Sequence, residues 1–162
     1  MNRPKVLELT FLTQTHQDRT WGGRLDSQKI LAEPRSILFG QTYPFPLDSA
    51  DETGLKGHAL FDHDGKGYRL KITESMYVRL HVLHMGNDLE SYTNERFDDN
   101  AEFDRFESHF PKSSCGIHTI PLMENSRGSV LFGKTTILFK FRDARPSFLA
   151  WLWDARPRLC SF

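Results

Sequence analysis

The sequence predicts an all-β protein, a sandwich of mostly antiparallel strands with a short inserted acidic helix and a short C-terminal aromatic helix. Three observations lead there: short segments in which apolar and polar residues alternate, glycine-containing turn signals between those segments, and one internal stretch with helical periodicity. The 162 residues, 38% of them hydrophobic, are enough for one sizeable core and are unlike a disordered or fibrous chain.

The first part of the chain contains three expected strands. Apolar side chains at every second position predict a strand over residues 7–12. Two shorter strands are expected at 29–32 and 36–39, bounded by proline and glycine. Aromatic residues and prolines alternate over 43–47, which predicts an edge strand or an extended loop because proline cannot donate a ladder hydrogen bond.

A hairpin is expected over residues 58–72. Two alternating runs, 58–62 and 68–72, flank an Asp-Gly pair at positions 64 and 65, and such a pair tolerates the positive backbone angles of a tight turn. Residues 77–83 have the alternation of a further strand. The sequence therefore predicts three consecutive strands in this region.

A second hairpin is expected near the end of the domain. Runs 129–132 and 135–141 are separated by Gly133 and Lys134, which is a two-residue hairpin signal.

Residues 87–110 form an acidic insertion, extending to about 112, in which we expect a short amphipathic helix. Eight carboxylates against two arginines give it a formal charge of minus six, so the rest of this neutral chain carries plus six. Phe103, Phe106 and Phe110 share one helical face. They pack inward beneath a solvated acidic face, or the helix is a docking surface.

Residues 143–162 are expected to form an aromatic and basic tail after a sandwich domain over 1–142. Two copies of Asp-Ala-Arg-Pro flank 147–153, where Ser147 is a candidate N-cap for a two-turn helix. Trp151 and Trp153 either close the bottom of the sandwich or contact a partner or a membrane surface.

The residues that could carry chemistry do not form a recognisable constellation, so we expect no catalytic, metal or cofactor site. His81 and His84 would point to opposite faces of a strand. The Asp62-His63-Asp64 run coincides with a turn, and Cys115 with His118 lacks a third orienting group. Glycine-rich nucleotide loops are absent from the sequence.

Charge and cysteine content bound the partners and the compartment. Lys plus Arg number 21 and Asp plus Glu number 21, so no global field attracts nucleic acid or an anionic membrane. No apolar run reaches the roughly 18 residues of a membrane span, and two cysteines favour a reducing, cytoplasmic setting. We therefore expect neither nucleic acid as a partner nor a membrane span.

Four features of the sequence have a recognisable spacing: the strand that ends at Gly40, the His58-Ala59 pair about 18 residues later, the glycine-turn hairpin, and the closing pattern over 120–139. Through these features, about residues 6–141 resemble the forkhead-associated (FHA) family. The resemblance implies a β-sandwich whose apical loops bind a peptide.

The resemblance also implies what has been lost. The family reads phosphothreonine with an arginine and a serine, and the matching positions are Gln41 and Leu55, which cannot replace those phosphate contacts. We therefore expect a non-catalytic scaffold or signalling module that binds a protein or peptide, for which a basic partner suits the acidic insertion. Candidate contacts are Gln41, Leu55, Lys56, His58 and Arg79 in the apical loops, and Phe97, Phe103, Phe106, Trp151 and Trp153 in the insertion and tail.

Two alternatives stay open. Lys56 and Arg79 could bind a phosphopeptide in place of the missing residues, or the chain could be an enzyme of unrecognised type. The opening strand, the closing strand and the Arg-Pro-aromatic exit also resemble degenerate FHA-type cytoplasmic domains of bacterial gliding-motility and envelope proteins. That likeness implies a scaffold role.

Overall fold

Two antiparallel β-sheets and one helix make up the described part of the protein. The computed structural model describes residues 5–15, 24–32, 34–38, 58–84, 88–95, 100–133 and 135–144. The elements are β1 (Lys5–Thr15), β2 (Arg24–Ala32), β3 (Ile37–Leu38), β4 (Ala59–His63), β5 (Tyr68–Ile72), β6 (Tyr77–His84), β7 (Asp88–Thr93), α2 (Ala101–His109), β8 (His118–Pro121), β9 (Arg127–Phe132) and β10 (Thr135–Asp143).

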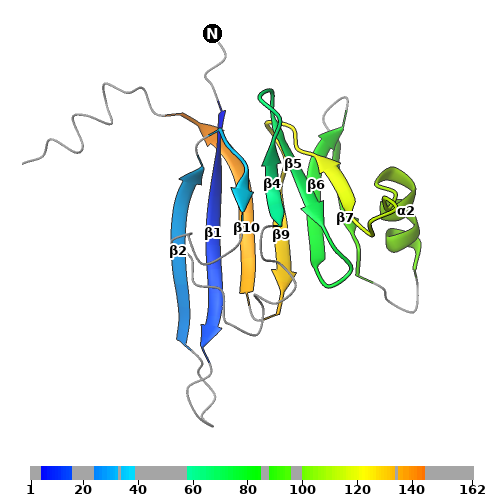
Figure 1. Ribbon diagram of the computed structural model, residues 1–162, viewed down its shortest axis with the longest axis horizontal. Helices are drawn as coiled ribbons and strands as arrows, with labels where there is room; N and C mark the ends of the chain where they lie inside the picture. Colours follow the sequence, from blue (N-terminus) through cyan, green and yellow to red (C-terminus); the bar gives the residue numbers. More distant parts are fainter. Residues whose placement is uncertain are drawn as a thin grey trace, which may run out of the picture.

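The strands are ordered β2-β1-β10-β9-β6-β7 in a six-stranded sheet and β3-β4-β5-β8 in a four-stranded sheet (Figure 1). All of the strand pairs are antiparallel. The predicted all-β class with antiparallel pairing is therefore confirmed.

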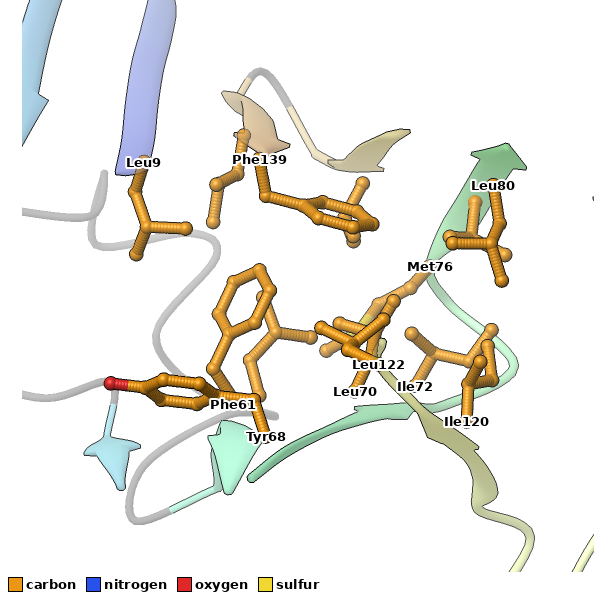
Figure 2. Packing of buried hydrophobic residues seen from close by; sticks show 14 of the residues in the cluster. Leu9, Phe61, Tyr68, Leu70, Ile72, Met76, Leu80, Ile120, Leu122 and Phe139 are labelled. Carbon is orange, nitrogen blue, oxygen red and sulfur yellow. The ribbon is translucent and has the colours of Figure 1, made fainter. Parts of the chain in front are cut away.

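The core lies between the two sheets. Leu9 and Phe139 of the six-stranded sheet face Phe61 and Leu70 of the four-stranded sheet (Figure 2), and the Phe61 and Phe139 rings meet edge to face with centroids 5.5 Å apart. Each of these four side chains is almost fully buried, and each such burial contributes about 1.5–3 kcal/mol to folding. The arrangement is therefore sandwich-like.

Both predicted hairpins are present. Strands β4 and β5 are joined through Gly65, whose φ of +88° is accessible to glycine at little cost. Strands β9 and β10 are joined through Gly133, with a φ of +53°. The glycine signals located these turns correctly because each turn requires a positive φ.

The strand β1 is longer than the predicted strand over 7–12, and it pairs with a strand on each side. It pairs with β10 from Lys5↔Asp143 to Thr13↔Thr135, which brings the opening and closing strands side by side. It also pairs with all of β2, which begins at Arg24, whereas the predicted strand began at residue 29. Residues 24–28 lack apolar alternation, and the backbone hydrogen bonds to the long β1 compensate for it.

The acidic insertion contains the short helix that the sequence predicts, together with a strand that it does not predict. Residues 88–93 form the edge strand β7 on β6, and the helix is limited to α2. Pairing with β6 buries the Tyr92 side chain and satisfies backbone groups, and this tertiary gain outweighs the acidic, helix-like pattern.

The helix α2 is attached to β7 (Figure 1) by a cluster around Tyr92. The Arg105 guanidinium lies 4.8 Å from the Tyr92 ring centroid and 3.3 Å from the Glu90 carboxylate, and the Tyr92 hydroxyl donates to Glu90. Burial, followed by the Glu90 carboxylate, raises the pKa of the Tyr92 hydroxyl. Phe106 is fully buried, so this candidate partner contact belongs to the core instead.

Two predictions lie outside the described residues: the extended segment 43–47 and the C-terminal helix 147–153.

Candidate binding site at one end of the sandwich

A cavity of about 320 Å³ opens where the β5–β6 turn, the end of β7 and the connection from α2 to β8 meet. This volume is at the lower end of the roughly 300–1,000 Å³ that is usual for ligand pockets. Its lining combines apolar, amide and charged groups: Glu74, Met76, Tyr77, Asn94, Phe103, Lys112 and His118. We call it the end cavity.

The Asn94 side chain holds one wall of the end cavity. Its Oδ1 accepts a hydrogen bond from Val78 N at 2.5 Å, and its Nδ2 donates to Met76 O at 2.8 Å. The amide thus ties the β5–β6 turn to the residue that follows β7. Since Met76 is fully buried, this wall is fixed before any ligand arrives.

His118 forms the inner wall. The residue is 3% exposed, its Nδ1 donates to Phe110 O at 2.5 Å, and its ring lies edge-on to Phe106 with centroids 5.2 Å apart. Because Nδ1 carries the proton in this hydrogen bond, Nε2 is the ring nitrogen left to accept one. The connection from α2 to β8 therefore fixes both the tautomer and the orientation of the ring.

Charged groups lie on the outer side of the end cavity. Lys112 Nζ is 2.7 Å from Glu74 Oε1, with side chains 26% and 73% exposed. An exposed ion pair of this kind contributes at most about 1 kcal/mol, so a competing anion can draw Lys112 away at little cost.

The candidate contact Arg79 is already paired. Its Nη2 lies 2.9 and 3.2 Å from the two carboxylate oxygens of Glu95. A phosphate would have to displace this carboxylate. Arg79 faces away from the core on β6 and does not line the end cavity.

The candidate contact His58 has a structural partner. Its Nε2 is 2.7 Å from Lys71 O, which links the start of β4 to β5. Of the predicted contacts that the structure describes, Phe103 alone lines the end cavity. The remaining candidates, Gln41, Leu55, Lys56, Phe97, Trp151 and Trp153, lie outside the described residues.

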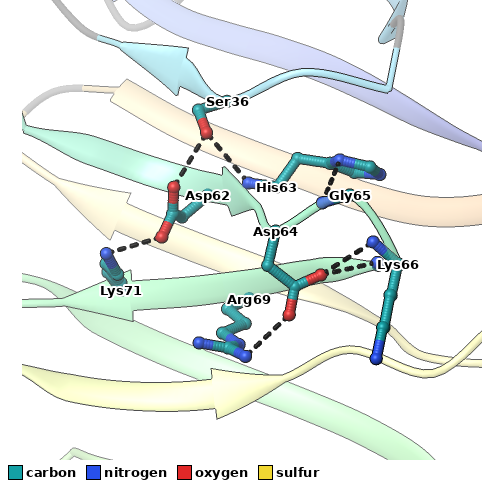
Figure 3. A network of polar contacts seen from close by, with 9 residues as sticks. Ser36, Asp62, His63, Asp64, Gly65, Lys66, Arg69 and Lys71 are labelled. Atoms are coloured by element: carbon teal, nitrogen blue, oxygen red, sulfur yellow. Dashed lines mark hydrogen bonds and ion pairs between the residues drawn. The ribbon is translucent and has the colours of Figure 1, made fainter.

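The Asp62-His63-Asp64 run belongs to a polar network around the β4–β5 turn (Figure 3). Asp64 Oδ1 accepts from the backbone of Lys66 and Gly67, and Asp62 pairs with Lys71 at 2.6 Å. A hydrogen bond from Lys71, followed by one from the Ser36 hydroxyl, lowers the pKa of the Asp62 carboxyl. Within the described residues, no group of three or more metal-ligand side chains is present.

Comparisons with known proteins add nothing to the geometry of the end cavity. No protein-family model, curated protein or solved structure matches the chain. Among the residues that the structure describes, no helix has the length and apolarity needed to cross a membrane.

Sequence reasoning missed five residues that line the end cavity: Glu74, Met76, Tyr77, Asn94 and Lys112. They come from three separate loops and one strand start, and each is of an ordinary type for its position. A weak signal is the position of Asn94 directly after a strand. Only the three-dimensional arrangement brings the five together.

Proposed function

We propose that this protein is a non-catalytic protein-interaction module that binds a short segment of a protein partner at the end cavity. The observation that carries the proposal is the lining itself. Met76 and Phe103 offer apolar contact, while Asn94, His118 and Lys112 offer hydrogen bonds on fixed elements. A concave site that combines a few placed polar groups with apolar walls suits one or two inserted side chains.

The composition of the lining favours binding over catalysis. Among the described residues that line the end cavity, there is no serine or cysteine nucleophile, and His118 is oriented by a backbone carbonyl. A general base in a nucleophile–base pair needs a nucleophile within hydrogen-bond reach.

Charge beside the cavity favours a basic partner. Glu102 and Asp104 of α2 are exposed, and Phe103 between them reaches the cavity. A segment with an apolar residue next to Lys or Arg would fill the cavity and meet these carboxylates. We expect binding not to depend on a phosphate group, because the Arg79 guanidinium already pairs with the Glu95 carboxylate. Gln41 and Leu55 at the FHA-like positions agree with this expectation.

A matched peptide library tests the proposal. Random peptides with a fixed central threonine are compared with the same library carrying phosphothreonine, and the best binders are measured by calorimetry and mapped by NMR. We expect similar affinities for both forms and shifts concentrated at Met76, Asn94 and His118. The reversed charge in Lys112→Glu should raise the affinity for a basic segment about ten-fold. Lys66→Glu, in the β4–β5 turn, should leave the affinity unchanged.

Two results would overturn the proposal. One is micromolar binding that requires the phosphate and is lost in Arg79→Ala, which would favour the phosphopeptide alternative. The other is a set of shifts that avoids the end cavity.

A further inference from the structure

The six-stranded sheet has a face turned away from the core, which we call the outer face. Along β6, β9 and β10 the buried residues alternate with exposed ones, as expected when one face is packed. Outward positions include Tyr77 on β6, Leu131 on β9 and Leu138 on β10. These three side chains are 49%, 39% and 41% exposed.

Together with Leu12 these residues form an apolar strip across the sheet, in which Thr136 lies between Leu131 and Leu12. Tyr77 is directly opposite Leu131. Leu131 and Leu12 both pair with Thr136, and Leu138 lies two positions further along β10, diagonal to both leucines. Side chains opposite one another in a sheet are about 5 Å apart and diagonal ones about 7–8 Å. The strip therefore crosses four adjacent strands.

Cations lie at the other end of the outer face. Arg127 is directly opposite Lys140, and Arg142 follows two positions along β10; we call these three residues the basic row. Like charges placed opposite each other destabilise a strand pair. Glu8, which is 2% exposed, offsets part of this through Lys140 at 3.5 Å and Arg142 at 2.9 Å.

Two donors of the basic row remain unused among the described residues. Arg127 makes no ion pair there, and Arg142 Nε is buried without a hydrogen-bond partner. A buried donor without an acceptor costs about 1–3 kcal/mol in general. The end of the outer face beside Glu8 thus carries more positive charge than its own carboxylate neutralises.

We propose that the outer face binds an acidic, leucine-rich or aromatic segment of a protein partner. The apolar strip takes the apolar side chains and the basic row takes carboxylates. Leu131 lies four positions along β9 from Arg127, which is about 13 Å at 3.3 Å per residue. In an extended partner segment, the carboxylates should therefore lie about four residues from the apolar side chains.

The shape and charge of the outer face favour a protein over a membrane or a nucleic acid. Its exposed apolar residues lie on strands within the sheet surface, and among the described residues named for it Tyr77 is the one aromatic ring available for base stacking. Glu8 lies among its cations. This site adjoins the end cavity through Tyr77, which belongs to both, and its other named residues do not line that cavity.

Selection from displayed random 16-residue peptides tests the inference. We expect enrichment of Asp and Glu about four residues from Leu or Phe. Arg127→Glu should weaken the selected peptides about ten-fold. It should keep or raise the midpoint of thermal unfolding, because glutamate would form a favourable pair with Lys140. If Arg127 had only a structural role, peptide affinity and the midpoint of thermal unfolding would fall together.

Matched controls complete the design. Leu138→Asp should abolish binding, whereas Met123→Asp, at a 59% exposed position in the β8–β9 turn, should not. Lys66→Glu should leave the affinity unchanged. Selected peptides without acidic enrichment, no enrichment at all, or equal affinity for Arg127→Glu would overturn the inference. So would binding of phosphatidylserine vesicles or a single-stranded oligonucleotide that is lost in Leu138→Asp.

Discussion

Gly128 shows how closely neighbouring strands of the six-stranded sheet approach at a single residue. A Cβ added there would lie 2.2 Å from Arg79 O and 2.9 Å from the Phe139 ring. The carbonyl belongs to the neighbouring strand and cannot move without breaking the ladder. Sequence reasoning had no means to see this, because the closest contact joins β9 to β6, which is distant in the chain.

We expect Gly128→Ala to lower the free energy of unfolding by about 1–3 kcal/mol or more, as overpacking generally does. Denaturant unfolding measures the change. Gly67→Ala is the control, because its added Cβ meets no atom within 4 Å, and it should change stability by less than about 0.5 kcal/mol. Equal effects of the two substitutions would contradict the steric account.

The lowered pKa of Asp62 predicts a dependence of stability on pH. Because the folded pKa lies below the ordinary value of 3.8, the carboxylate stabilises the fold above that value, and the contribution is lost as pH falls through the folded pKa. Asp62→Asn should therefore cost roughly 1 kcal/mol at pH 6. The difference from wild type should shrink below about pH 4 in urea unfolding curves. A difference that is constant with pH would show that the charge has no role.

At the scale of elements, the hairpins were predictable and the edge of the large sheet was not. Asp64 and Gly65 encode their turn locally, through side-chain caps and a positive φ. Strand β7 is encoded by its neighbour, since β6 supplies the pairing that residues 88–93 cannot provide alone. The sequence therefore placed residues 88–93 in the acidic insertion without predicting a strand there.

Phe106 anchors the helix α2. A nine-residue helix is marginal in isolation, so its stability must come from packing. We expect Phe106→Ala to cost about 3–5 kcal/mol and to raise the hydrogen-exchange rate of the α2 amides. Phe103→Ala, at a half-buried position on the same helix, should cost less. An equal cost for both would mean that α2 is not held through Phe106.

At the scale of the whole molecule, an all-β class followed from alternation, but the end cavity did not. The all-β class follows from the alternation of apolar and polar residues within short segments, which can be seen directly in the sequence. The end cavity depends on three loops meeting, and the lengths and pairings that bring Asn94 to Met76 and His118 to Phe110 are properties of the assembled sheets. The separation of charge between the acidic insertion and the rest of the chain can be counted in the sequence. The residues of the outer face can be identified only from the strand register.

Strand order also predicts the order of folding. Strands β4 and β5 are joined by a short turn, whereas β1 must find β10 more than a hundred residues away. Loop-closure entropy delays such pairings, and proteins dominated by them fold in milliseconds to seconds. We expect pulse-labelling hydrogen exchange to protect β5 amides before β1 amides.

A pair of glycine variants extends this test. Gly65→Ala, in the β4–β5 turn, should slow refolding, while Gly116→Ala, which also has a positive φ and open space, should mainly speed unfolding. Protection of β1 first would contradict the proposed order.

The pairing of β1 with β10 has a mechanical consequence. Lys5 and Asp143 face each other at one end of this ladder, so a force that pulls the two strands apart from there would load one pair at a time. The hydrogen bonds of antiparallel strands run perpendicular to the chain, along the direction of that pull. The ladder would unzip at low force instead of resisting in shear, so the domain should yield readily when tension is applied across these two strand ends.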